Sequence, residues 1–433
     1  MRIIHIAAGA AGMYCGACAR DMMLARGLME RGHDMLIVPL YTPLRDDNPH
    51  LPAPATSAVY LGGINAWLQQ VSSFFRILPP AFDRMLDNPG LLRWVSRFAV
   101  STKAEDLGPM TVSVLSGREG LQKKELERLV DFLHSQSPPD LICLTNMLLS
   151  GIAPELKRQF HCPIVCTFQG EDSFIQAMSE PWGSRARELM ASNAEFIDLF
   201  ISPNESCTHR MLTFLPVPRE KLCIIPIGVN VDDYNRISDT EQPVFTVGYL
   251  SAITPAKGLD ILAAAVLTLL EEGREIRVKV AGKTLNDKYL HEITTMLKNS
   301  GRANSFEFYG ELEFDRKREF LHDISAFCVP SRLQEARGQA WLEAMAAGLT
   351  VIGPDNGAFP EMFSEDAGKL IIPNDPLALA TVLRELMDDP EEVKRYGNNA
   401  VKRAGEVYSL NKLILSTERA YLQIAGQPCP DGP

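Results

Sequence analysis

The chain lacks several features that would place it in a special class of protein. Its longest apolar run, LAAAVLTLL at 262–270, is about half as long as the roughly 20 residues that a transmembrane helix needs. Its 43 lysine and arginine residues are outnumbered by 54 acidic ones, which argues against a nucleic-acid-binding protein with a basic surface. The nine cysteines are scattered without the spacing pattern of a disulfide framework, and the N-terminus shows no signal-peptide pattern. We therefore expect a cytoplasmic protein without a disulfide framework.

Sequence motifs of several kinds of catalytic site are also absent. The chain has no D-x-D pair, the usual carboxylate pair for a divalent metal, and its eight histidines are not clustered. It has no G-x-S-x-G, no G-x-x-x-x-G-K-[ST] and no H-E-x-x-H. The sequence therefore predicts neither a metal site nor a cofactor.

Short apolar runs alternate with helical stretches, and this alternation occurs twice. Six strands are predicted before residue 232, and the polar stretch DDYNRISDTEQP at 232–243 separates them from five more, which begin with VFTVGYL. Two successive β-α series predict two doubly wound domains of the α/β class, with a ligand cleft at the carboxyl ends of the strands. We place an N-terminal domain at 1–236 and a C-terminal domain at 237–408. A final helix at 409–424 either packs locally or returns to the first domain.

The stretch RLQEARGQAWLEAMAAG at 332–348 holds two glutamates eight positions apart. Glu335 is predicted on a loop after a strand, and Glu343 on the helix that starts near Gly338. The N-terminus of this helix favours an anion such as a diphosphate, and a carboxylate on either side can bind sugar hydroxyls. The alternative is that Glu335 pairs with Arg332 or Arg337 and that Glu343 lies on a solvated helix face.

Two further loops could approach a phosphate. Lys257 and Gly258 lie between a strand and a helix, where a lysine can reach a phosphate and glycine lets the backbone come close, although a surface lysine before a helix is common. The first β-α turn contains Gly9, Gly12 and Gly16, but not in the spacing of a dinucleotide fingerprint.

Two other features have an open interpretation. Cys15 and Cys18 form a C-x-x-C pair; no further metal ligands are near, which argues against zinc, and we favour loop packing over a redox role. Residues 64–103 combine aromatic side chains with arginines. They predict either two helices that pack on the domain or an amphipathic segment that makes a peripheral membrane contact.

The combination of these features resembles the retaining nucleotide-sugar glycosyltransferases of family 4, which have the GT-B fold. The resemblance covers most of the chain and is strongest from Val244 to Asp388. It is carried by the glycine loop and RGLMERGHDMLIV, by GYLSAITPAKGLDIL, and by AFCVPSRLQEARGQAWLEAMAAGLTVIGPDNGAFPEM. The family's C-terminal helix crosses back to the N-terminal domain, which would account for residues 409–433.

The resemblance implies a role for individual residues. Lys257, beside Gly258, would bind the donor diphosphate and Glu335 the transferred sugar, so these two are the expected catalytic residues. Glu343 would bind the ribose. The remaining donor-side positions would be the backbone amides at the helix start, the turn near the base and the glycines of the first domain: Gly338, Gln339, Ala340, Gly310, Gly12 and Gly16.

The sequence departs from the family pattern at three places. Ser251-Ala252 stands where the family usually has Gly-Arg, and TFQGED, with Gln169 and Gly170 on the expected acceptor or sugar side, replaces a histidine motif. The boundary motif reads PIGVN instead of P-N-G-V-D. Arg337 and Lys283 are the candidates to replace the missing phosphate-binding cation.

The resemblance thus implies a retaining, metal-independent transferase that uses a nucleotide-sugar, with a UDP-sugar as the expected donor. Its expected acceptor is a carbohydrate or a lipid-linked molecule, and nucleic acid is not an expected partner. Two alternatives stay open: an epimerase or hydrolase of nucleotide sugars, and a non-catalytic GT-B protein that binds a sugar nucleotide.

Overall fold

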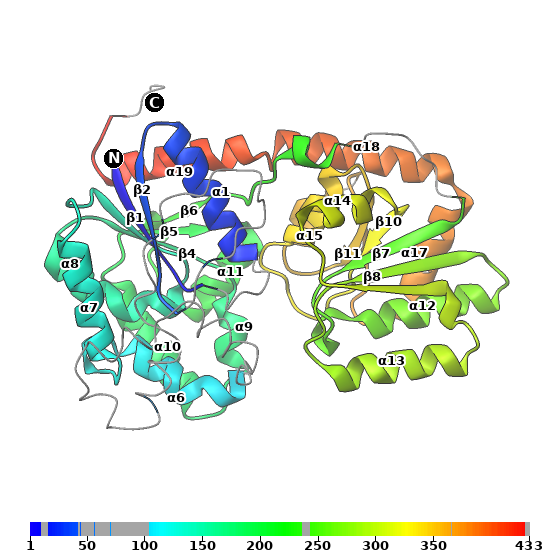
Figure 1. Ribbon diagram of the computed structural model, residues 1–433, viewed down its shortest axis with the longest axis horizontal. Helices are drawn as coiled ribbons and strands as arrows, with labels where there is room; N and C mark the ends of the chain where they lie inside the picture. Colours follow the sequence, from blue (N-terminus) through cyan, green and yellow to red (C-terminus); the bar gives the residue numbers. More distant parts are fainter. Residues whose placement is uncertain are drawn as a thin grey trace. The chain divides into compact units, whose positions relative to one another are not determined.

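The computed structural model describes most of the chain (Figure 1). The described residues are 1–9, 16–41, 44, 56, 70, 104–235, 243–364 and 366–428. Gly12, Cys15 and, apart from residue 70, the segment 64–103 lie outside these ranges, so the predictions made for them stay predictions. Within the described ranges, no helix is long and apolar enough to cross a membrane.

The chain divides into two compact units, each built on one parallel sheet. Unit 1 comprises 1–225 and 413–433, and unit 2 comprises 226–412. The sheet of unit 1 has the order β2-β1-β3-β4-β5-β6 and that of unit 2 the order β12-β11-β10-β7-β8-β9. All strand pairs within both sheets are parallel. The prediction of two doubly wound α/β domains is therefore confirmed.

The strands are short and most of their apolar side chains are buried, as the apolar runs predict, although Phe308 and Tyr309 on an edge strand of unit 2 are exposed. In unit 1 they are β1 (Arg2–Ala7), β2 (Asp34–Pro39), β3 (Leu141–Leu144), β4 (Ile164–Thr167), β5 (Leu199–Ser202) and β6 (Leu222–Ile224). In unit 2 they are β7 (Phe245–Leu250), β8 (Ile276–Ala281), β9 (Phe306–Gly310), β10 (Ala326–Cys328), β11 (Thr350–Pro354) and β12 (Lys369–Ile371).

The helices connect these strands and cover the sheets. Unit 1 has α1 (Gly16–Glu30), α6 (Ala104–Leu115), α7 (Lys123–His134), α8 (Ala153–Phe160), α9 (Glu171–Gln176), α10 (Trp182–Ala194) and α11 (Glu205–Phe214). Unit 2 has α12 (Leu259–Glu271), α13 (Asp287–Asn299), α14 (Phe314–His322), α15 (Gln339–Ala346), α16 (Phe359–Phe363), α17 (Pro376–Asp388) and α18 (Pro390–Glu406). Figure 1 shows α12 and α13 on the same side of the unit 2 sheet. Helix α12 connects β7 to β8 and α13 connects β8 to β9, so both connections lead towards the same edge of the sheet.

The chain changes from unit 1 to unit 2 between Ile225 and Pro226, before the polar stretch that suggested a boundary at 236/237. The residues after β6 already belong to unit 2 because they pair with the segment that joins α18 to α19. The Val229 amide donates to the carbonyl of Tyr408 over 2.8 Å, and the Leu410 amide donates to the carbonyl of Val229 over 2.9 Å.

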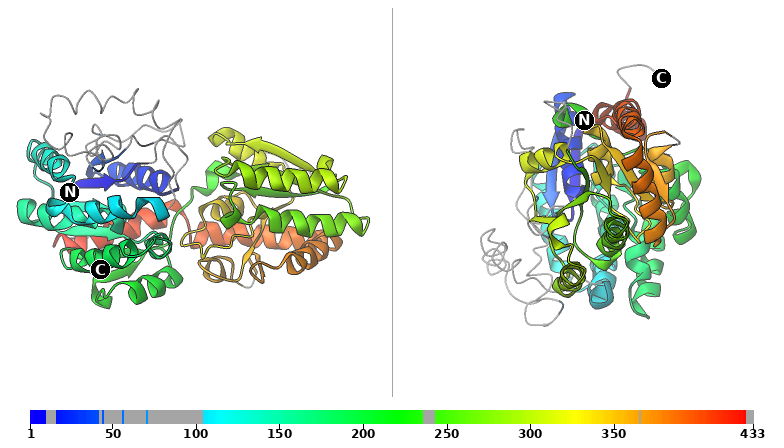
Figure 2. Two further views of the ribbon diagram at one scale, coloured as in Figure 1. Left: turned by 90° about the horizontal axis from the view of Figure 1, so that it is seen from below. Right: turned by 90° about the vertical axis from the view of Figure 1, so that its right-hand side faces the viewer.

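The last helix, α19 (Leu410–Ile424), belongs to unit 1 from Leu413 onward. It packs beside α1, where the absence of a side chain at Gly27 leaves room for Ile414. The two helices are blue and red in Figures 1 and 2, and Glu418 of α19 also pairs with two residues that directly follow α1. The buried carboxylate of Glu418 accepts from Arg31 Nε at 2.5 Å and lies 2.8 Å from His33 Nε2.

We expect Glu418→Ala to lower the free energy of unfolding by about 2 kcal/mol, because the variant removes the acid from a largely buried ion-pair cluster. Thermal and urea unfolding would measure this loss. The matched control is Glu188→Ala in unit 1, which removes an exposed acid paired with Arg185 and should change stability by less than about 0.5 kcal/mol. Equal effects of the two variants would contradict an anchoring role for Glu418.

Candidate functional site

The central feature of unit 2 is the point where the strand order reverses. From β7 the chain proceeds to β8 and β9, and it then returns to β10 on the other side of β7. The strands β7 and β10 are therefore neighbours whose connections lead towards opposite edges of the sheet. In open α/β sheets, ligands bind at such a point. The first loop carries Lys257 and the second carries Glu335.

The backbones of these two loops are in direct contact. The Arg332 amide donates to the carbonyl of Ala256 over 2.8 Å. Gly258 has a φ of +72° and lies so close to β10 that a Cβ atom there would be 2.0 Å from the carbonyl oxygen of Pro330. Only glycine satisfies both conditions. The sequence predicts that Gly258 lets the backbone come close to a phosphate. In the structure, Gly258 lets its loop come close to the backbone of Pro330.

Arg332 makes the contact between the loops rigid. Its guanidinium donates to the Pro255 carbonyl over 2.6 Å and to both carboxylate oxygens of Asp260 over 2.9 and 2.7 Å. Burial raises the pKa of Asp260, but the hydrogen bonds from Arg332 and Tyr289 outweigh it, and the net pKa is lowered. Arg332 is therefore paired with Asp260, and the alternative in which it pairs with Glu335 is wrong.

Glu335 instead forms an ion pair with Lys257. The side chains of Lys257 and Glu335 keep 22% and 16% of their exposure, so both remain accessible from solvent. The hydroxyl of buried Ser331 donates to the same carboxylate oxygen of Glu335 over 2.8 Å. The two expected catalytic residues, which are far apart in the sequence, are thus in contact.

The loop that carries Glu335 rests on the turn after β11. Gly357 has a φ of +58°, and a Cβ atom there would be 2.7 Å from both the backbone nitrogen and the carbonyl oxygen of Glu335. The next residue, Ala358, donates its amide to that carbonyl over 2.9 Å. This turn therefore determines the height of Glu335 above the end of the sheet.

Helix α15 begins directly after the Glu335 loop. Gly338, with a φ of +72°, precedes Gln339 and Ala340, the first helical residues. The first amides of a helix have no acceptor within it and attract anions. Arg337 beside them is half-buried and has no hydrogen-bond or ion-pair partner among the residues described. These positions combine helix amides with an available cation.

Glu343 lies one turn further along α15 and is only 4% exposed. It does not lie on a solvated helix face, so that alternative is wrong. Its Oε1 atom accepts from Nζ of Lys317, a residue of α14, over 2.9 Å. The ammonium of Lys317 is also within 5.7 Å of the ring centroid of Phe314.

The other donor-side candidates are at the ends of β8 and β9. The Gly282 amide donates to the carbonyl of Gly310 over 2.7 Å. A Cβ atom at Gly282 would be 1.8 Å from the carbonyl oxygen of Ser251, so these strand ends are close together. Lys283 is exposed, its carbonyl accepts from the Ile253 amide over 2.9 Å, and its side chain forms no ion pair with the described part of the chain.

In unit 1, the side chain of Gln169 spans two strand ends. It donates to the carbonyl of Thr145, after β3, over 2.6 Å. Gly170, with a φ of +89°, then turns the chain into α9. The carboxylate of Glu171 accepts from the backbone amides of Gln169 and Met147, each over 2.7 Å. Burial raises the pKa of Glu171, an effect that these amides oppose. Gln169 is thus held by the protein on one side of its amide group.

A buried charged cluster lies near the start of α1, which begins at Gly16. Asp21 interacts with His5 at 3.1 Å and with Arg20 at 3.2 Å, and it accepts from the hydroxyl of Thr145. Burial alone would lower the pKa of His5, but the carboxylate of Asp21 outweighs it and raises the pKa to about 10. The cluster connects β1, α1 and the end of β3.

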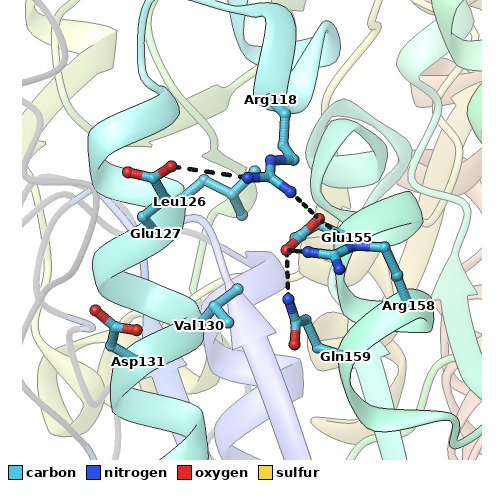
Figure 3. A pocket seen from close by; sticks show the side chains of 8 residues that line it. All are labelled: Arg118, Leu126, Glu127, Val130, Asp131, Glu155, Arg158 and Gln159. Atoms are coloured by element: carbon cyan, nitrogen blue, oxygen red, sulfur yellow. Dashed lines mark hydrogen bonds and ion pairs between the residues drawn. The ribbon is translucent and has the colours of Figure 1, made fainter.

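Unit 1 also has a surface pocket, between α7 and α8 (Figure 3). Glu155 at its centre accepts from Arg158 over 2.6 Å and from Gln159 over 2.8 Å, and Arg118 is 3.4 Å away. The hydrogen bond from Arg158 is the main reason why the pKa of Glu155 is lowered. These charges satisfy one another, so we assign this group a structural role. In the described part of the molecule, no three His, Cys, Asp or Glu side chains gather as metal ligands would.

Two family models match the chain. The model described as Glycosyltransferase Family 4 matches residues 107–233, and that described as Glycosyl transferases group 1 matches residues 231–403. The second match contains both loops of the switch point and all of α15. The chain belongs to the GT-B glycosyltransferases.

Curated relatives are similar over part of their length. The chain is 27% identical over 237 residues to MMP alpha-(1->4)-mannosyltransferase of Mycolicibacterium hassiacum, which covers 54% of this chain and 56% of the relative. It is 24% identical over 173 residues to phosphatidyl-myo-inositol mannosyltransferase of Mycolicibacterium smegmatis, which covers 40% of this chain and 43% of the relative. The chain therefore spans about half the length of the curated relatives it matches.

Solved structures resemble the chain over almost its whole length. Sucrose-phosphate synthase from Thermosynechococcus elongatus has a TM-score of 0.73 at 17% identity and covers 98% of this chain and 99% of its own. Anabaena HepE in complex with UDP and glucose has a TM-score of 0.68 at 16% identity and covers 98% and 100%. At these identities the likeness shows the fold.

Several residues that shape the site of this glycosyltransferase were not predicted from its sequence. Ser331 was read only as the end of a strand, and the buried residues Lys317, His5 and Asp21 have no local signal. Gly357 did have one, because Asn-Gly is a turn signal that favours positive φ.

We expect Gly357→Ala to displace the Glu335 loop and to lower the free energy of unfolding by about 2–3 kcal/mol, because it combines strain at positive φ with a backbone collision. The control is Gly301→Ala, at a φ of +69° with no atom within 4 Å of the added Cβ, which should cost about 1 kcal/mol. Thermal unfolding with and without UDP and GDP measures both effects. If Gly301→Ala weakens the nucleotide response as much as Gly357→Ala, the turn after β11 has no special role.

Proposed function

We propose that this protein is a retaining glycosyltransferase that moves a sugar from a nucleotide-sugar donor to a carbohydrate or lipid-linked acceptor, without a metal ion. The observation that carries the proposal is the pair of Lys257 and Glu335 at the switch point of unit 2, directly before the N-terminus of α15. A cation, oriented amides and a carboxylate are the groups needed to hold a diphosphate and the hydroxyls of a sugar.

In this proposal the donor binds to unit 2. The diphosphate lies at the amides of Gly338, Gln339 and Ala340, and Lys257 and Arg337 offset its charge. Lys283, next to the loop that contains Ala252, supplies a further cation near the strand ends. Glu335 accepts hydrogen bonds from the sugar, Glu343 accepts them from the ribose, and the base lies towards Gly310.

Catalysis then rests on stabilising the leaving diphosphate. The bond between the sugar and the diphosphate breaks while the acceptor hydroxyl attacks from the same face, and an oxygen of the leaving phosphate takes up the acceptor proton. Lysine, arginine and helix amides stabilise the charge that develops on this phosphate, so no protein nucleophile and no metal ion is required. Unit 1, with Gln169 and Gly170, holds the acceptor.

The names of similar proteins indicate which donors to test. Relatives include a GDP-mannose-dependent mannosyltransferase of Corynebacterium glutamicum, which acts on a phosphatidylinositol monomannoside, and HepE was solved with UDP and glucose. We propose a UDP-sugar as the first donor to test and GDP-mannose as the second, with an inositol-containing lipid among the acceptors. A lipid acceptor would bring unit 1 to a membrane surface.

We expect the transferred sugar to keep its anomeric configuration and the reaction to continue in excess EDTA. Proton NMR of the product from UDP-glucose or GDP-mannose with an acceptor panel measures the configuration. Inversion, or loss of turnover in EDTA that magnesium restores, would refute this mechanism. Release of free sugar or of a C2-inverted donor without acceptor would favour a hydrolase or epimerase, and binding without turnover would favour a non-catalytic protein.

The ion pair leads to a sharper prediction. In the free protein Glu335 neutralises Lys257, so a diphosphate must compete with this carboxylate for the lysine. Glu335→Gln keeps the shape and the acceptor for Ser331 but removes the charge. We expect Glu335→Gln to tighten UDP or GDP binding about threefold, the value of a partly exposed ion pair. We also expect it to slow sugar transfer at least about tenfold, because a neutral amide stabilises the positive charge that develops on the transferred sugar less well than a carboxylate does.

Calorimetry with the nucleoside diphosphate and initial rates with the nucleotide sugar measure the two effects separately. Lys257→Met is the matched control, because it breaks the same pair from the other side and should weaken diphosphate binding. If Glu335→Gln weakens the binding of the nucleoside diphosphate as much as Lys257→Met does, Glu335 does not compete for the lysine.

A further inference from the structure

Lys317 is an unusual residue within unit 2. It lies on α14, the helix that follows the turn at Gly310, and is only 6% exposed. Lysine is rarely buried to this degree without a specific partner. Its partner is Glu343 of α15, at 2.9 Å, and the side chains of both residues are less than 10% exposed.

A buried ion pair of this kind is a poor way to stabilise a fold. The loss of hydration of two charges offsets most of their attraction, and apolar residues of similar size often serve as well. The neighbouring packing includes Phe314, whose ring lies below the ammonium, so the surroundings would accept an apolar side chain. The pair therefore calls for an explanation other than stability.

The position of the pair suggests that explanation. In any nucleotide the ribose connects the base to the diphosphate. Lys317 lies one turn into the helix after Gly310, the base side of the proposed site, and Glu343 lies five residues after Gly338, the diphosphate side. At 1.5 Å per residue, Glu343 is roughly 4.5 to 6 Å along α15 from the amides of Gln339 and Ala340. The ion pair thus connects the two elements between which the ribose must lie.

We propose that Lys317 is a positioning residue that holds the carboxylate of Glu343 towards the ribose hydroxyls and so makes the site selective for ribonucleotides over 2′-deoxyribonucleotides. This inference rests on the proposed function. A carboxylate can accept about four hydrogen bonds, so one carboxylate can bind the ammonium of Lys317 and a hydroxyl donor at the same time. A carboxylate fixed in one orientation distinguishes a ribose with two hydroxyls from a deoxyribose with one. A mobile carboxylate adapts to both sugars.

The test compares Lys317→Met with the wild type in calorimetric titrations of UDP, 2′-deoxy-UDP, GDP, 2′-deoxy-GDP and inorganic pyrophosphate. The wild type should prefer the ribonucleotide that it binds by about tenfold or more, since a site built to bind a hydroxyl rejects a ligand without it. Lys317→Met should reduce this preference to about twofold and leave pyrophosphate affinity unchanged. Glu343→Gln should lose the same preference, and Lys317→Arg should retain part of it.

Lys279→Met is the matched control. It removes another poorly exposed lysine of unit 2, which pairs with Asp323, and should leave the preference for ribonucleotides as it is. A Lys317→Met protein that keeps the wild-type preference, or loses affinity for nucleotides and pyrophosphate equally, would overturn the role of Lys317 alone. A wild-type protein that binds none of the nucleotides would overturn the proposed function as well. If Lys317→Met does not fold, Lys317→Arg and Glu343→Gln decide the question in the same titrations.

Discussion

The site depends on the contact between the backbones of two loops at the centre of the unit 2 sheet. Gly258 lies against the carbonyl of Pro330, and a side chain at this position would push the β7 loop away from the β10 loop. The bidentate pair between Arg332 and Asp260 holds the same two loops together at their outer side. This contact, together with the turn at Gly357 that supports the Glu335 loop, brings Lys257 and Glu335 together.

Much of the fold could be predicted from the sequence because its strands are buried on both faces and read as continuous apolar runs. Strands such as RIIHIA and IRVKVA, and helices that end before Gly32 and Gly273, needed only local information. The strand β12 has three residues, and α18 follows α17 after a single residue, so neither has a clear pattern of its own. Helix α19 packs beside α1, which is distant in the sequence, and local patterns therefore leave the place of α19 open.

The candidate site could be predicted as a set of residue types, but not as a set of pairs. The sequence places Glu335 on a loop and Glu343 on a helix, and both positions agree with the structure. Their partners are supplied by tertiary contacts: Lys257 lies 78 residues from Glu335 and Lys317 lies 26 residues from Glu343. Nothing local distinguishes Lys317 from the other charged residues of RKRE, and only the packing of α14 on the sheet buries it.

The two glutamates differ in a way that suits two different tasks. The Glu335–Lys257 pair is partly exposed, so its attraction is screened by water and a ligand can replace it at small cost. The Glu343–Lys317 pair is buried, so its separation would leave two unhydrated charges and it stays closed. A group that changes partners during a reaction needs the first environment, and a group that must present one fixed geometry needs the second. Burial, rather than residue type, therefore assigns the exchangeable role to Glu335 and the fixed role to Glu343.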